Sequence, residues 1–66
     1  MGNVNLRIDC SRLKLSAVDD LAKRLRMYLS NVIVAGEDLI YASGNISTHD
    51  YNNVWKIIDW YDVTVS

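Results

Sequence analysis

Cys10 and His49, the only cysteine and the only histidine, are the side chains best suited to nucleophilic chemistry. A neighbouring imidazole can activate a thiol as a Cys–His dyad. We expect the strand ending at Cys10 to run parallel to the strand preceding His49, which would place both residues at the same end of a sheet. However, Cys10 shares its alternation with Val4, Leu6 and Ile8, which is typical of a small buried apolar residue. Catalysis also needs several side chains held together in a defined geometry, and the sequence shows no such set. We therefore predict that the protein is not an enzyme.

The acidic residues and glycines do not follow a known ligand-binding pattern either. Glu37 and Asp38 fall in a predicted turn, and no further ligands stand at the spacing of a calcium loop. One cysteine and one histidine cannot form a Cys/His zinc site, and one cysteine excludes an internal disulfide. The three scattered glycines cannot form a phosphate-binding loop. We therefore expect no cofactor and no metal.

Basic residues are concentrated in the first half of the chain. Residues 1–30 hold six basic and three acidic residues, whereas residues 31–66 hold one basic and five acidic residues. A basic patch at residues 12–26 could bind a nucleic-acid backbone. Asp19 and Asp20 partly neutralise it, and the predicted sheet lacks the paired aromatic residues of RNA-binding sheets. Nucleic-acid binding is therefore the alternative function, and it would use Arg12, Lys14, Lys23, Arg24 and Arg26.

Large apolar side chains outside the core-facing stripes suggest protein binding. On a helical wheel Trp60 lies opposite the stripe that begins with Tyr51, and Ile57 lies between them. Met27 falls on the polar side of the first predicted helix. Tryptophan is the residue type most enriched at energetic hot spots of interfaces. We predict a partner-binding set that consists of Trp60, Ile57, Asp59, Asp62 and Met27.

The 66 residues form one small domain, residues 1–66, of which half are apolar. A chain of this size is marginally stable alone and usually needs a disulfide, a metal or self-association. The formal net charge of −1 opposes association little, so we predict a homodimer. One reduced cysteine favours the cytoplasm, and no apolar run approaches the roughly 20 residues that span a membrane. The chain begins at Met1, as a whole gene product would.

Hydrophobic periodicity divides the chain into six elements. Residues 4–11 alternate as a strand, and apolar residues at helical spacing predict a helix over about 16–30, capped by Ser16. Two apolar runs at 32–35 and 39–42 predict a hairpin, after which Gly44 and Asn45 break the second strand. A second helix is expected to begin after Ser47, and residues 63–65 form a short last strand.

This β-α-β-β-α-β order predicts an α+β fold, a ferredoxin-like two-layer sandwich with a four-stranded antiparallel sheet and both helices on one face. The expected core is shared by sheet and helices and consists of Val4, Leu6, Ile8, Leu21, Leu25, Leu29, Val54 and Ile58. This fold hosts many unrelated functions and selects none.

The absence of catalytic parts in so small a chain favours a non-enzymatic protein–protein interaction module that binds or inhibits a larger protein. Phages and mobile elements encode many such proteins, including inhibitors of host defence, so a phage protein is one expectation. A small-molecule sensor using the loop ends of the sheet is a third hypothesis. Against this hypothesis, the turn between the first strand and the first helix, residues 11–14, lacks the glycines that such a sensor would need.

Overall fold

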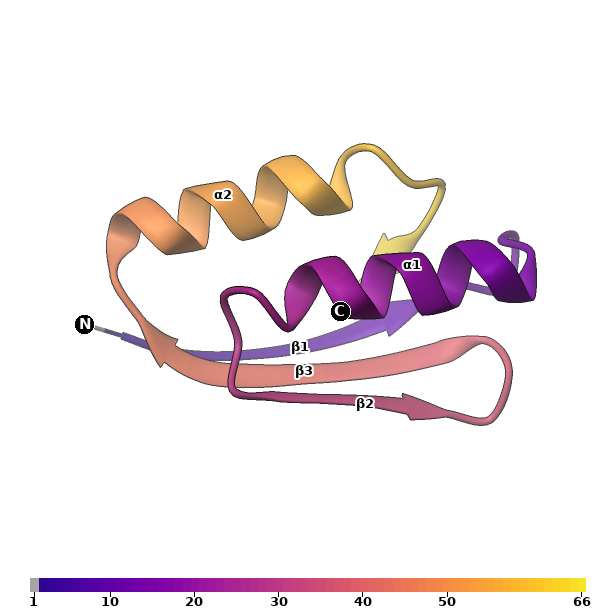
Figure 1. The fold of residues 1–66 in the computed structure, drawn as a ribbon, viewed down its shortest axis with the longest axis horizontal. Helices are drawn as coiled ribbons and strands as arrows, with labels where there is room; N and C mark the ends of the chain where they lie inside the picture. Colours follow the sequence, from indigo (N-terminus) through magenta and orange to yellow (C-terminus); the bar gives the residue numbers. More distant parts are fainter. Residues whose placement is uncertain (1) are drawn as a thin grey trace.

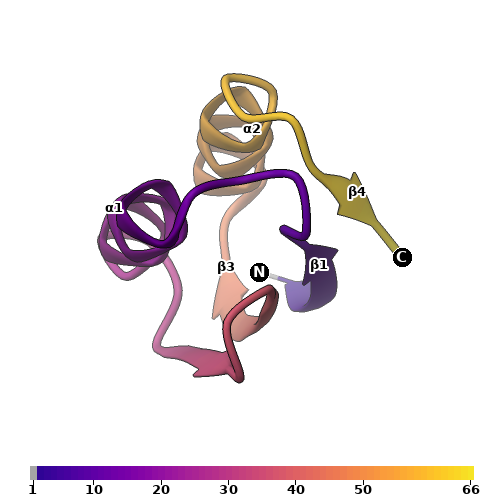
Figure 2. The ribbon, with the colours of Figure 1, turned by 90° about the vertical axis from the view of Figure 1, so that its right-hand side faces the viewer.

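The computed structural model describes residues 2–66, so the expectation of a whole gene product, which rests on Met1, lies outside the described residues. The chain forms an α+β structure in which one antiparallel sheet, ordered β2-β3-β1-β4, is combined with two helices (Figure 1). The elements are β1 (Gly2–Asp9), α1 (Leu15–Leu25), β2 (Asn31–Ala35), β3 (Leu39–Ile46), α2 (Thr48–Ile58) and β4 (Thr64–Val65). Figure 2 shows both helices on the same side of the sheet.

The predicted alternation of the first strand is confirmed. Val4, Leu6 and Ile8 are buried, whereas the residues between them are exposed. All eight residues of the predicted core belong to one buried cluster, which Cys10, Val18, Ile40 and others complete. The core therefore lies between the sheet and the helices, and the opposite face of the sheet is open.

The expectation that the first and third strands run parallel is wrong. β1 pairs with β3 in the antiparallel sense, from Gly2 opposite Ile46 to Asp9 opposite Leu39. The physical reason is the connectivity: α1 carries the chain across so that β2 runs parallel to β1, and the β2–β3 hairpin then reverses direction. Cys10 and His49 consequently lie at opposite ends of the sheet, and a dyad between them is excluded.

The predicted break at Gly44 and Asn45 is also wrong, because β3 continues through both residues to Ile46. Gly44 lies opposite Val4, and the segment that follows α1 crosses directly over it. A Cβ at this position would lie 3.2 Å from the backbone nitrogen of Ser30. The glycine therefore allows a close approach of two backbones rather than ending the strand.

The two helix starts differ in how well they were predicted. Ser47 caps α2 as expected, since its Oγ accepts a hydrogen bond of 3.2 Å from the backbone N–H of Asp50. By contrast, α1 begins at Leu15 with Lys14 as the N-cap residue and no side-chain cap, so the cap at Ser16 is wrong. Neither helix of the described chain is long and apolar enough to cross a membrane.

Candidate protein-binding surface

Trp60 is an exposed aromatic side chain in a fixed position. It follows α2 directly, in a turn where its backbone N–H donates to the carbonyl of Ile57. Its side chain is 71 % exposed. The guanidinium carbon of Arg24, on α1, lies 5.5 Å from the centroid of the Trp60 ring. This cation–π contact orients the indole against α1 while leaving most of it in solvent.

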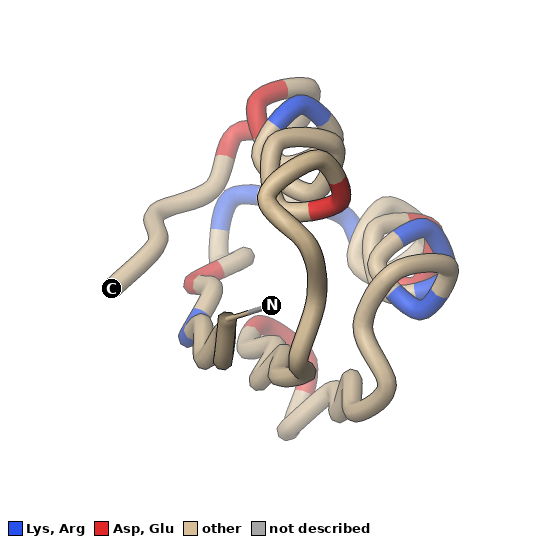
Figure 3. The backbone as a smooth tube through the Cα atoms, turned by 90° about the vertical axis from the view of Figure 1, so that its left-hand side faces the viewer, with Lys and Arg blue, Asp and Glu red and all other residues tan. Residues whose placement is uncertain are grey.

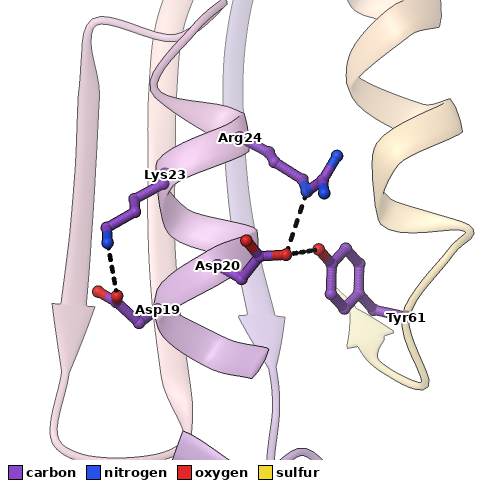
Figure 4. A network of polar contacts seen from close by, with 5 residues as sticks. All are labelled: Asp19, Asp20, Lys23, Arg24 and Tyr61. Atoms are coloured by element: carbon purple, nitrogen blue, oxygen red, sulfur yellow. Dashed lines mark hydrogen bonds and ion pairs between the residues drawn. The ribbon is translucent and has the colours of Figure 1, made fainter. Parts of the chain in front are cut away.

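A polar network beside Trp60 joins the end of α2 to α1 (Figure 4). The Tyr61 hydroxyl donates to Oδ2 of Asp20 over 2.6 Å, and Nε of Arg24 donates to the same oxygen over 3.1 Å. These hydrogen bonds, chiefly that from Tyr61, lower the pKa of Asp20. Burial, together with the carboxylate, raises the pKa of Tyr61. The carboxylate therefore stays ionised and connects two elements that flank Trp60.

We call the patch formed by Asp20, Arg24, Trp60 and Tyr61 the Trp60 surface. The four-residue spacing of Asp20 and Arg24 places both side chains on one face of α1. Nothing in the sequence indicated Tyr61, since its contact with Asp20 joins residues far apart in the chain.

The other predicted partner-binding residues are distributed around this patch. Asp59 is exposed beside Trp60, whereas Ile57 is partly buried against the core and is not an exposed anchor. Asp62 is exposed and pairs with Arg12 over 3.0 Å. Met27 is 75 % exposed just beyond α1.

Most of the predicted basic patch is engaged within the molecule. Arg12, Lys23 and Arg24 form ion pairs of 3.0–3.1 Å with Asp62, Asp19 and Asp20. Arg26 donates to the backbone carbonyl of Val32 on β2 over 3.2 Å. Within residues 2–66, Lys14 is the only one of the five without such a contact. Figure 3 shows basic and acidic positions side by side on α1, which weakens the positive field that a polyanion would meet.

The open face of the sheet carries apolar side chains that the partner-binding prediction missed. Ile33 is 53 % exposed and Tyr41 is 44 % exposed. They lie directly opposite each other on β2 and β3, and Arg7 of β1 lies opposite Tyr41 on its other side. The hairpin prediction implied this alternation, because residues 33 and 41 have the opposite parity to the buried Val32 and Ala42.

The residues considered for chemistry are not assembled into a site. Cys10 is fully buried, and this burial raises the pKa of its thiol, so the reactive thiolate is disfavoured. An open cleft of about 280 Å³ separates the start of β1 from the start of α2 and is lined by Gly2, Asn3, Val4, Ile46, Ser47, Thr48 and Tyr51. His49 does not line it. No group of three or more potential metal ligands occurs among residues 2–66.

Comparison with known proteins finds no matching family model, no matching curated protein and no matching solved structure.

Proposed function

We propose that this protein is a non-enzymatic interaction module that binds a larger protein through the Trp60 surface. The observation that carries the proposal is the 71 % exposure of Trp60 on a structured part of the chain. An indole left in water is unfavourable for the free protein, and its burial by a partner is correspondingly favourable. A module of this kind would act as an inhibitor by covering a surface that its partner needs.

The contacts around Trp60 support this proposal because they reduce the entropic cost of binding. Arg24 holds one side of the indole, and the Asp20–Tyr61 hydrogen bond fixes the turn that carries it. A side chain ordered before binding loses less freedom when a partner covers it. Asp59 and the Arg24–Asp20 pair provide a polar rim around the aromatic centre, the usual arrangement of an interface.

Two further proposals concern the fold family and the location of the protein, and neither selects the function. We propose that the architecture is ferredoxin-like, because strand order and helix placement agree with two split β-α-β crossovers (Figure 2). We also propose a cytoplasmic location, where the free thiol of Cys10 stays reduced.

Comparative capture tests the proposed function. The full chain is immobilised and exposed to an extract of cells of its source organism, in parallel with Trp60→Ala and Leu15→Ala. Leu15 is a matched control because it is 61 % exposed but lies at the start of α1. We expect a specific protein to be retained by the parent and by Leu15→Ala and lost with Trp60→Ala. Equal retention by Trp60→Ala, or no specific protein at all, would contradict the proposal.

A binding measurement on the same purified protein distinguishes the proposed function from nucleic-acid binding. Fluorescence anisotropy at low salt is measured with a labelled single-stranded RNA and a DNA duplex. Because most basic side chains are already paired, we expect at most weak binding that disappears at physiological salt. Tight binding that is reduced by Lys14→Glu would favour the nucleic-acid function instead.

A further inference from the structure

The open face of the sheet contains two short rows of residues that are complementary to each other. The strand register aligns Arg7, Tyr41 and Ile33 in one row, and Asp9, Leu39 and Ala35 in the next. In each row the first residue comes from β1, the second from β3 and the third from β2. We call these the Tyr41 row and the Leu39 row.

We propose that this face pairs with the same face of a second copy of the chain, across a two-fold axis that crosses the strands between the two rows. This axis places the Tyr41 row of one subunit opposite the Leu39 row of the other. Arg7 then meets Asp9 of the partner subunit, and Ile33 meets Ala35 of the partner subunit. Each cation therefore faces an anion, and each large side chain faces a smaller one. Every such contact occurs two times, because the two-fold axis relates the two subunits.

The charges of the face favour a second copy over a strongly charged partner. On β1, β2 and β3, the outward positions carry one cation, Arg7, and one anion, Asp9. The face is therefore neutral and matches itself, whereas a polyanion would meet Asp9. The backbone N–H of Ser11 donates to the Asp9 carboxylate over 2.9 Å and lowers its pKa, so the anion is maintained at neutral pH.

The β2 edge of the sheet is less suited to pairing than the open face. The Arg26 guanidinium there contacts the outward carbonyl of Val32, which an added strand would need. An engaged edge is one way in which proteins prevent strand addition. At the other edge, β4 pairs with β1 only at Ile8 and Asp9, so residues 2–6 of β1 are the competing site for a second copy.

The size of the face sets the expected strength. The four strands have eight, five, eight and two residues, which at about 3.3 Å per residue and about 4.8 Å per strand give a face of roughly 360 Å². Two such faces bury about 700 Å², below the usual size of a stable interface, so we expect weak, reversible association in the upper micromolar to millimolar range. The helices lie on the far side of the sheet, so both Trp60 surfaces of the dimer stay free (Figure 2).

Sedimentation equilibrium of the full chain, from micromolar concentrations to about 1 mM, tests the dimer. We expect the mass to rise from 7.5 kDa toward twice that value. Ile33→Asp should weaken association at least tenfold, while Leu15→Asp, which places the same charge on another exposed apolar position, should leave it unchanged. Arg7→Asp and Asp9→Arg should each weaken association several-fold, and the double exchange should restore it.

Several results would overturn this inference. A monomer of 7.5 kDa throughout the range contradicts it. So does a dimer that tolerates Ile33→Asp, particularly one that Arg26→Ala strengthens, because that pattern identifies the β2 edge as the interface. If Ile33→Asp does not fold, backbone NMR of the unmodified chain decides, since concentration-dependent shifts must be centred on the two rows. The Trp60→Ala variant must dimerise normally, which separates this inference from the proposed function.

Discussion

At the scale of single residues, Cys10 shows how a chemically reactive side chain can serve only as packing. Its alternation with Val4, Leu6 and Ile8 predicted a buried thiol, and the residue is fully buried although β1 ends at Asp9. Its thiol, a weak donor, donates a hydrogen bond of 3.7 Å to the backbone carbonyl of Ile8. The side chain therefore behaves as a small apolar group.

We expect the Cys10 thiol to react with an aromatic disulfide reagent slowly in the folded protein and rapidly after denaturation. Burial removes both access and the thiolate, whose formation the raised pKa disfavours. Cys10→Ser should destabilise the fold more than Cys10→Ala, because it buries a hydroxyl in an apolar site. Rapid labelling under native conditions would show that Cys10 is accessible, contrary to this account.

The hydrogen bond from Tyr61 to Asp20 predicts a specific dependence on pH. The pKa of Asp20 is lower in the folded state, so its ionised form stabilises the fold at neutral pH. This contribution is lost as the pH falls below about 4 and through the lowered pKa. Tyr61→Phe should raise the pKa of Asp20 in an NMR titration, and the acid-sensitive part of the stability should shrink.

Tyr41→Phe is the matched control for that titration, since it removes an exposed tyrosine hydroxyl from the opposite layer of the molecule. It should leave the pKa of Asp20 unchanged. An unchanged pKa in Tyr61→Phe would mean that this hydrogen bond does not position the turn that carries Trp60.

At the scale of elements, periodicity located the helices and strands, and the errors have local physical causes. The helical spacing of Leu21, Leu25 and Leu29 predicted α1 and its buried face. The predicted end near residue 30 is wrong, because the helix ends at Leu25 and residues 26–28 form a turn. The prediction that the strand ends at Gly44 is wrong because the glycine allows two backbones to approach each other. Such a close approach leaves no periodic pattern in the sequence. The Trp60 exposure followed from its wheel position, but the Arg24 and Tyr61 contacts depend on how the helices pack.

The close approach at Gly44 can be tested by adding one methyl group. In Gly44→Ala the new carbon would lie 3.2 Å from the Ser30 nitrogen and 3.3 Å from a methyl group of Leu29, so these neighbours must give by a few tenths of an ångström. We expect a loss of about 1–3 kcal/mol in the free energy of unfolding measured with urea. Gly2→Ala is the control, because no atom lies within 4 Å of its added carbon. Equal stability of the two variants would contradict the crossing.

At the scale of the whole molecule, the two layers separate packing from recognition. The core lies between sheet and helices, the open sheet face carries Tyr41 and Ile33, and Trp60 lies beside the helices. The sequence predicted the composition of the core correctly. The antiparallel sheet predicted from the order of the elements is present, and the parallel direction expected for β1 and β3 is wrong because it conflicts with that sheet.

The central claim is that Trp60 is an anchor for a protein partner and not part of the core. The most direct test is the equilibrium affinity of the captured partner for the parent chain and for Trp60→Ala, together with the melting temperature of each. Loss of a central tryptophan costs about 2–4 kcal/mol of binding, so we expect affinity to fall at least tens-fold while the melting temperature is retained. Unchanged affinity, or a Trp60→Ala variant that no longer folds, would contradict the account.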